Sequence, residues 1–324
     1  MTSLVGNTAA QAAFGSAMQG RSLHHAWLLV GPEGVGKATF ARAAALRMLV
    51  DGAHPGSVAA DAAVPPGHPT RALVDAGSHP DFRTLARLPK DADKPDQDLA
   101  RSITIAQVRS LQPMFATVPS MSARRVVVID AADDLERGGA NALLKNLEEP
   151  PAGTIFLLVS HAPGRLLPTI RSRCRLLRFE ALAEDQVASV LRGQLPDADP
   201  ADLAALAGTA DGAPGRALRH AGLDVAGLQR ALTTIATTGD PDNRERVKLA
   251  RALAGKAAAP RYAAFLELAP SFVARAARTR TGQALQVALD AHSAARDLAG
   301  AAQGLSLDPQ ATAFEMAGIV ARLR

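Results

Sequence analysis

The chain is poor in cysteine and in aromatic residues. Cys174 is its single cysteine among 324 residues, which excludes an intramolecular disulfide framework and suits a reducing compartment. Phe, Trp and Tyr make up only 3% of the residues, although 48% are hydrophobic. Alanine is spread throughout the chain, which favours helices that pack closely through small side chains.

Long hydrophobic runs are missing as well. The sequence contains no stretch of about 18 apolar residues that would cross a bilayer. Its N-terminal residues do not show the basic segment and apolar run of a secretory leader. We therefore expect a cytoplasmic protein without membrane contact. The chain is long enough for two or three domains, each with its own core.

Positive charge is in modest excess. The formal net charge is +5 and the pI is about 9.9, and only six of the 36 basic residues are lysines. A basic protein can contact nucleic acid. Here, however, the charges are dispersed along the chain, so they define no particular nucleic-acid patch.

Residues 1–180 alternate between strand and helix patterns, which predicts an α/β domain with a parallel sheet and helices on both faces. Thr104 and Gln107 have the spacing of a capping box and mark the start of one helix. From the spacing of apolar residues we expect strands at 26–30, 79–88, 126–129, 154–159 and 175–179, and helices at 103–115 and 141–149.

The remaining segments are an insert and two helical parts. Residues 51–80 are rich in Ala, Gly and Pro without periodicity, which predicts a long loop. His54, His68 and His79 lie in or beside this insert without a cluster of cysteines or carboxylates, so we expect them to be solvated and to bind no metal. Short helices are predicted in a small domain at 181–222, and longer amphipathic helices in a third domain at 223–324.

The segment GPEGVGKA at 31–38 has the GxxxxGK pattern of a phosphate-binding loop, placed between a predicted strand and a predicted helix. Gly31, Gly34 and Gly36 let backbone N–H groups curl around phosphate oxygens, and Lys37 reaches the β- and γ-phosphates. The alternative is a glycine turn that binds nothing.

The residue after this lysine is usually Ser or Thr, whose hydroxyl binds Mg2+. Ala38 removes that ligand, and Thr39 lies one step further round the helix, where it is a poor substitute. The pattern thus keeps the backbone cradle and loses a metal ligand. It leaves open whether ATP or ADP occupies the loop.

A second feature of nucleotide hydrolases is present only in part. The β-branched run at 126–129 ends in Asp130, which is placed to bind Mg2+ at the end of a buried strand. A hydrolase needs another carboxylate directly after it to orient the attacking water, and here that residue is Ala131. Asp133 and Asp134 lie two or three residues too far along the chain to replace it, so we do not expect the chain to hydrolyse ATP.

Two further polar features follow the next predicted strand. Ser160 ends the run TIFLLVS, where its hydroxyl would face a γ-phosphate or simply cap a turn. Arg171 and Arg173 lie in the turn PTIRSRC. A planar, permanently charged guanidinium suits the stabilisation of charge on a transferring phosphoryl group, although an isolated pair of arginines is usually solvated or paired with acids.

These motifs occur together in one known family. The ordered segments GPEGVGK, HPDF, VVVIDAADDL, NALLKNLEEPP, LLVSHAPGRLLPTIRSRC and DGAPGRAL resemble the delta-prime subunits of bacterial DNA polymerase III clamp loaders. The resemblance covers about residues 4–222, and the run HAPGRLLPTIRSRC is its most specific part. The helical tail matches only in length and pattern.

The resemblance implies an AAA+ fold: an α/β nucleotide-binding-like domain, a helical lid, and a helical collar that assembles five subunits into an open ring. Delta-prime is the stationary subunit, which does not hydrolyse ATP. Its partners are the gamma/tau and delta subunits and, through the complex, the sliding clamp and primer-template DNA. Arg173 would act in trans as an arginine finger on the ATP of the adjacent gamma or tau subunit.

The chain departs from the pattern of the family that it resembles in three respects. Related loader subunits carry a four-cysteine zinc module after the first helix, whereas residues 51–80 contain no cysteine, so we expect no zinc. Arg216 falls one place late for the nucleotide-sensing arginine of the motor subunits, and we do not assign it that role. Lys37 is retained although some relatives have lost it, so a statically held nucleotide is left open.

Two enzymatic alternatives compete with this interpretation. One is an ATP-hydrolysing AAA+ motor subunit of the gamma/tau kind, which Ala38 and Ala131 disfavour because each removes a separate part of the reaction. The other is a P-loop kinase or GTPase, for which the sequence offers neither a base nor a specificity motif.

Overall fold

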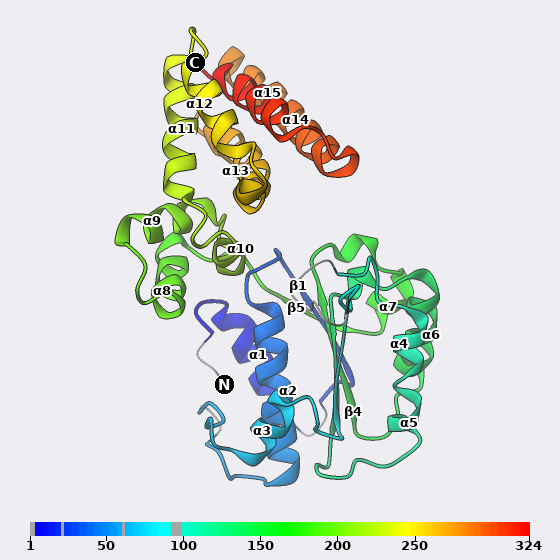
Figure 1. Ribbon diagram of the computed structural model, residues 1–324. Helices are drawn as coiled ribbons and strands as arrows, with labels where there is room; N and C mark the ends of the chain where they lie inside the picture. Colours follow the sequence, from blue (N-terminus) through cyan, green and yellow to red (C-terminus); the bar gives the residue numbers. More distant parts are fainter. Residues whose placement is uncertain (1–3, 21–22, 60–61, 92–98) are drawn as a thin grey trace. The chain divides into compact units, whose positions relative to one another are not determined.

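We describe the protein from a computed structural model, which covers residues 4–20, 23–59, 62–91 and 99–324 (Figure 1). The chain forms two compact units, Met1–Leu182 and Ala183–Arg324. The first contains the sheet and the second is entirely helical in its regular structure. The division of the helical part into domains at 181–222 and 223–324 stays a prediction.

The first unit is built on a five-stranded parallel sheet in the order β2-β3-β4-β1-β5. Its strands are β1 (Ala26–Val30), β2 (Phe82–Ala86), β3 (Arg125–Asp130), β4 (Thr154–Ser160) and β5 (Arg175–Arg178). All five predicted strands are confirmed. The central strands read as nearly continuous apolar runs because helices cover both faces of the sheet.

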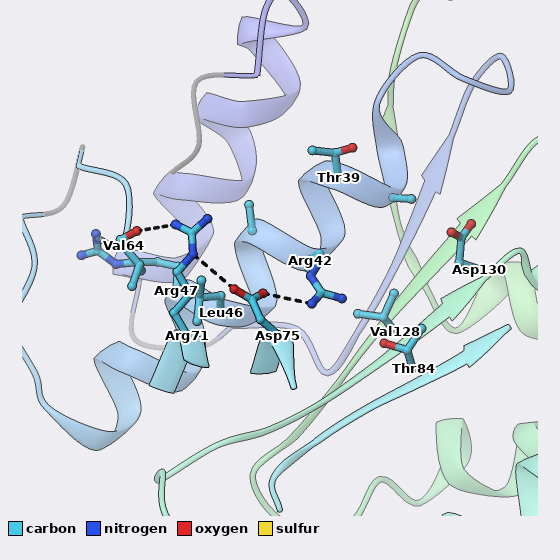
Figure 2. Close-up of a pocket in the computed structure, with 12 residues that line it drawn as sticks. Thr39, Arg42, Leu46, Arg47, Val64, Arg71, Asp75, Thr84, Val128 and Asp130 are labelled. Atoms are coloured by element: carbon cyan, nitrogen blue, oxygen red, sulfur yellow. Dashed lines mark hydrogen bonds and ion pairs between the residues drawn. The ribbon is translucent and has the colours of Figure 1, made fainter. Parts of the chain in front are cut away.

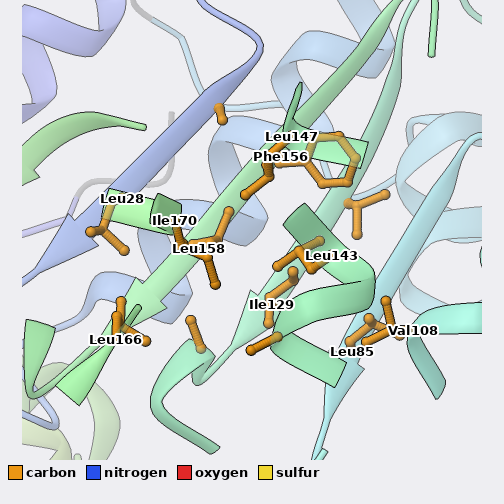
Figure 3. Close-up of a cluster of buried hydrophobic side chains, with 14 of the residues drawn as sticks. Leu28, Leu85, Val108, Ile129, Leu143, Leu147, Phe156, Leu158, Leu166 and Ile170 are labelled. Carbon is orange, nitrogen blue, oxygen red and sulfur yellow. The ribbon is translucent and has the colours of Figure 1, made fainter. Parts of the chain in front are cut away.

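Side chains of β1 illustrate the two faces. Leu28 and Val30 join a buried cluster with β3, β4 and the helices α6 (Arg137–Glu148) and α7 (Pro168–Ser172) (Figure 3). Trp27 points to the opposite face, where its ring packs against Phe14 of helix α1 (Thr8–Gln19) with 4.9 Å between centroids. Phe14 in turn packs against Phe40 of helix α2 (Lys37–Ala53). Successive strand residues face opposite layers, so one apolar run contributes to both cores.

The helices of this unit are α1 (Thr8–Gln19), α2 (Lys37–Ala53), α3 (Pro69–Asp75), α4 (Ile105–Arg109), α5 (Gln112–Phe115), α6 (Arg137–Glu148) and α7 (Pro168–Ser172), with short 3-10 turns η1 (Ala132–Asp134) and η2 (Pro163–Arg165). The capping box of Thr104 and Gln107 is confirmed at the start of α4. The single helix predicted at 103–115 is wrong, since Pro113, which lacks an N–H, lies in the first turn of a separate helix α5. Helix α6 begins at Arg137, four residues before the predicted start.

The insert is more regular than predicted. Helix α2 extends into it as far as Ala53, and α3 lies within it. Arg47 of α2 is only 7% exposed and organises the connecting segment: its guanidinium donates hydrogen bonds to the carbonyl oxygens of Val58 and Ala59 and pairs with Asp51. A buried cation that binds carbonyls thus holds the segment that connects α2 to α3.

The expectation that His79 is solvated is also wrong. Its side chain is 1% exposed, and its Nδ1 accepts a hydrogen bond from the backbone N–H of Asp81. Asp81 itself accepts hydrogen bonds from the backbone N–H groups of Ser120, Met121 and Ser122. The HPDF segment therefore fixes the loop that leads into β3, and burial lowers the pKa of His79.

The second unit consists of α8 (Glu184–Gln194), α9 (Pro200–Thr209), α10 (Pro214–Arg219), α11 (Val225–Thr238), α12 (Arg244–Leu253), the turn η3 (Lys256–Ala258), α13 (Ala259–Ala277), α14 (Gly282–Leu305) and α15 (Pro309–Ala321). Helices α8, α9 and α10 pack together, and α15 packs against α11, α12, α13 and α14. No helix in the described part of the chain is long and apolar enough to span a membrane.

Candidate functional site

The phosphate-binding loop has the strand–loop–helix setting that its pattern predicts. It leaves β1 at Val30 and enters α2 at Lys37, with φ values of 148° at Gly31, 80° at Gly34 and 104° at Gly36. These positive φ angles favour glycine. A Cβ at Gly31 would also lie 2.0 Å from the carbonyl oxygen of Phe179, so a side chain there would collide with the backbone after β5.

Lys37 is turned back onto this loop. Its side chain is 2% exposed, and Nζ donates hydrogen bonds to the carbonyl oxygens of Gly31 at 2.6 Å and Pro32 at 2.5 Å. Burial lowers the pKa of Lys37 to about 8, against the opposing effect of the nearby carboxylates, Asp130 first among them. A phosphate at the loop would therefore have to replace two short hydrogen bonds to reach this ammonium.

Ala38, Thr39 and Asp130 line one cavity of about 430 Å3 between α2 and the strands β2 and β3. Figure 2 shows Arg42 in this cavity, extended from α2 and joined to Asp75, while Asp130 lies at the end of β3. The structure thus places Thr39 and Asp130 in the lining of the same cavity. The loop glycines and Lys37 are not part of this lining. Burial raises the pKa of Asp130, opposed by the charges of His161 and Lys37.

Asp133 links the ends of two strands. Its carboxylate accepts hydrogen bonds from Ser160 Oγ at 2.8 Å and from the backbone N–H of His161 at 2.5 Å. Ser160 is fully buried at the end of β4. Its hydroxyl therefore points at Asp133, a partner that the sequence analysis missed because the two residues are 27 positions apart; its predicted role toward a γ-phosphate stays a prediction.

The position of the absent second carboxylate is apolar. Ala131 is 4% exposed, and its methyl group has no acid–base chemistry. Asp134, the other acid near this strand end, pairs with Arg87 at 3.0 Å. Asp133 is bonded to Ser160. Both carboxylates near Ala131 therefore already have partners and are not free to orient an attacking water.

Arg173 follows α7 directly, as its C-terminal cap. Its Nη2 lies 2.7 Å from Oε1 of Glu148, the last residue of α6, and its Nη1 donates to the carbonyl oxygen of Thr169. The Arg173 side chain is 35% exposed. In the described part of the chain no interaction joins it to Lys37 or Asp130. Glu148 was not singled out from the sequence, although it lies in the segment NLEEPP.

Arg216 is engaged within the helical unit. Its Nη1 pairs with Asp211 at 3.1 Å, and its Nη2 donates a hydrogen bond to Ser271 Oγ at 2.9 Å. These contacts join α10 to α13, so the guanidinium has a structural function there. They give no support to a nucleotide-sensing role for Arg216.

The sequence profile of the family described as "DNA polymerase III, delta subunit" matches residues 6–183, which is close to the whole first unit. The DNA polymerase III subunit delta' of Pseudomonas aeruginosa is 39% identical over 165 residues, which make up 51% of this chain and 46% of that protein. The delta' subunit of Escherichia coli K12 is 38% identical over 146 residues, 45% of this chain and 41% of that protein. The chain thus matches less than half the length of these two relatives.

The fold also has a counterpart among solved structures. The crystal structure of a DNA polymerase III gamma subunit-related protein from Thermotoga maritima aligns with 97% of this chain and 99% of its own, with a TM-score of 0.50 and 15% identity. At that identity the likeness shows the fold alone. It supports the predicted fold, an α/β domain with a parallel sheet followed by helices.

Proposed function

The chain belongs to the DNA polymerase III delta-prime family, and from this membership we propose that it is a non-hydrolysing subunit of the clamp loader. In this role it assembles with delta and gamma/tau subunits and helps to load the sliding clamp onto primed DNA during replication. It supplies Arg173 in trans to the ATP of the neighbouring motor subunit.

The absence of hydrolysis by this chain is supported by chemistry at two positions. Ala38 provides no hydroxyl for Mg2+, and Ala131 provides no carboxylate for the attacking water. Asp133 and Asp134, the nearest substitutes, are bonded to Ser160 and Arg87. A subunit that keeps the loop without this machinery is suited to hold its neighbours rather than to turn over ATP.

A bound ATP or ADP would have to open the loop. Its phosphate would replace the carbonyl oxygens of Gly31 and Pro32 as the partner of Lys37. The glycine cradle itself fits a phosphate, because Gly31, Gly34 and Gly36 all have positive φ angles that free the backbone to curl. We therefore rest the function on Arg173, which acts whether or not this loop is filled.

The observation that carries the proposal is the position of Arg173 beside the end of α7. Its guanidinium is partly exposed, and the side chain of its carboxylate partner, Glu148, is more exposed still. An exposed ion pair stabilises a protein by only about 0–1 kcal/mol. Replacement of Glu148 by a neighbour's phosphate as the partner of Arg173 therefore costs little free energy. Arginine fingers accelerate related nucleotidases by about 10³–10⁵.

The test is DNA- and clamp-stimulated ATP turnover by the reconstituted loader, with wild-type chain, Arg173→Ala and Arg171→Ala. Arg171 lies in α7, two residues before Arg173, and donates a hydrogen bond to the carbonyl oxygen of Pro163, which makes it a matched control. We expect Arg173→Ala to abolish ATP hydrolysis at the motor site next to this chain. The total ATP turnover of the loader should therefore fall by at least the fraction that this site contributes. Arg171→Ala should leave turnover unchanged.

Assembly must be measured beside turnover, by size-exclusion chromatography of each complex. An intact complex with an unchanged rate for Arg173→Ala would reduce this chain to a scaffold. The chain alone is the further control, since ATP hydrolysis by the isolated chain would favour the alternative of an ATP-hydrolysing motor subunit.

A further inference from the structure

A basic groove lies along the helical unit, Ala183–Arg324. It has a volume of about 440 Å3 and lies along α13 and α14, with Asp211 and the start of α10 beside it. The charged side chains that line it are Arg216, Arg275, Arg278, Arg296, Asp211 and Glu267.

The two acids of the groove already have partners. Asp211 pairs with Arg216 at 3.1 Å and with Arg275 at 3.5 Å. Glu267 lies 3.4 Å from His220 and 3.8 Å from Arg216. Within the described ranges, the side chains of Arg278 and Arg296 form no ion pair or hydrogen bond, and both are exposed. The groove therefore carries two guanidinium groups whose charge is not compensated.

These two arginines lie at different levels of the groove. The ring Nδ1 of His292 lies 3.2 Å from the carbonyl oxygen of Pro270, which puts these two residues of α14 and α13 side by side. The helices are joined by a short turn, so they run in opposite directions. At about 1.5 Å per residue, Arg278 lies about 12 Å from this level in one direction and Arg296 about 6 Å in the other. One small anion would not satisfy both.

The rest of the lining decides what kind of chain fits. Leu266, Pro270, Ala274 and Ala299 provide apolar surface, and no Phe, Tyr or Trp among the described residues lines the groove. The ring of His292 does line it, and its Nδ1 contacts the carbonyl oxygen of Pro270. Proteins that bind single-stranded nucleic acid combine basic grooves with aromatic side chains on which bases stack. Small apolar surface between separated arginines favours a peptide with carboxylates, and arginine is the cation that suits ion pairs at interfaces.

We propose that this groove binds an acidic segment of a partner protein, with one carboxylate on Arg278 and another on Arg296. An extended peptide covers about 3.3–3.6 Å per residue, so the two acidic residues are about five positions apart in its sequence, with about four residues between them. The groove belongs to the helical unit and uses neither Arg173 nor the phosphate loop. The assignment therefore stands or falls independently of the arginine-finger function.

The test uses fluorescein-labelled peptides that contain two glutamates separated by one, four or seven serine and alanine residues. Fluorescence anisotropy with the full-length chain should show the tightest binding for the middle spacing, and no binding when both glutamates are replaced by glutamine. Arg278→Gln/Arg296→Gln should weaken that binding about tenfold, since two partly exposed ion pairs are lost. Arg278→Glu/Arg296→Glu should weaken it further.

Arg251→Gln/Arg322→Gln is the matched control, because both residues are exposed on the helical unit and neither lines the groove. Equal weakening by the control pair, or binding that ignores the spacing, would overturn the proposal in favour of unspecific attraction to a basic protein. Tighter and groove-dependent binding of a dT oligonucleotide of equal charge would overturn it in favour of nucleic acid. The melting temperature of each variant shows that the helical unit stays folded.

Discussion

Arg173 and Glu148 form an ion pair in which Nη2 lies 2.7 Å from Oε1. The pair joins the residue after α7 to the last residue of α6. Both side chains are open to solvent, at 35% and 46% exposure. In the proposed role, Glu148 holds the guanidinium within its own subunit until a neighbour's phosphate replaces the carboxylate.

Glu148→Gln should therefore raise ATP turnover at the motor site that this chain serves. An exposed ion pair contributes at most about 1 kcal/mol, which corresponds to about a fivefold increase as the upper limit. The measurement is steady-state turnover of the reconstituted loader. Glu149→Gln, the same change one residue later and outside this pair, is the control. A fall in turnover for Glu148→Gln alone would show instead that Glu148 positions the arginine for its reaction.

Asp133→Ala should destabilise the first unit. The variant leaves the buried Ser160 hydroxyl and the His161 N–H without their acceptor, and an unsatisfied buried polar group costs about 1–3 kcal/mol. Urea unfolding followed by the fluorescence of Trp27, the single tryptophan, reports on this unit. Asp134→Ala breaks only the partly exposed pair with Arg87 and should cost less than about 1 kcal/mol. Equal losses for the two variants would contradict the linking role of Asp133.

Much of the first unit could be predicted from the sequence because its signals are local. The apolar runs of β1 and β4 are buried on both faces, and Gly31, Gly34 and Gly36 sit where positive φ angles are needed. The apolar spacing misled the prediction at 103–115, because it conceals the break between α4 and α5. Pro113 marks this break, since proline is accepted in the first turn of a new helix.

The contacts of the candidate site could not be predicted from the sequence, for a different reason. Ser160 meets Asp133, and Arg173 meets Glu148, only because the sheet places β3 beside β4 and α6 contacts α7. Such pairs depend on strand order and helix packing rather than on spacing along the chain. Lys37 is a similar case. The GxxxxGK pattern identifies this lysine, but it does not predict that the ammonium group binds the carbonyl oxygens of Gly31 and Pro32.

Lys37 should make the stability of the first unit depend on pH. Its pKa is about 8 in the folded chain against 10.5 for an unperturbed lysine. Between these values the unfolded state binds more protons, so the free energy of unfolding rises with pH, by up to about 3 kcal/mol in total. Below pH 8 the lysine is charged in both states and its contribution is constant. Lys37→Met removes this titration.

Urea unfolding of wild type and Lys37→Met, followed by Trp27 fluorescence at pH 7, 8, 9 and 10, isolates the lysine from other titrating groups. The difference between the two proteins should shift steadily in favour of wild type above pH 8. A constant difference over this range would show that Lys37 keeps an ordinary pKa and is not confined by the carbonyls of Gly31 and Pro32.

Arg47→Met should loosen the insert without unfolding the sheet. The guanidinium provides the hydrogen bonds to Val58 and Ala59 and the ion pair with Asp51. Methionine keeps the apolar stem and leaves these carbonyls unpaired, at about 1–3 kcal/mol of local stability. Amide hydrogen exchange of peptides at 54–59 should accelerate about 5- to 150-fold, while peptides of β3 and β4 keep their rates.

Arg42→Met is the matched control, because Arg42 lies on the same helix and pairs with the exposed Asp75 instead. It should leave exchange at 54–59 unchanged.

A zinc chelator should also leave exchange at 54–59 unchanged in wild type, since the insert contains no cysteine and Arg47 provides its central polar partner. Faster exchange after chelation would show that a metal orders this segment, and it would remove Arg47 from that role.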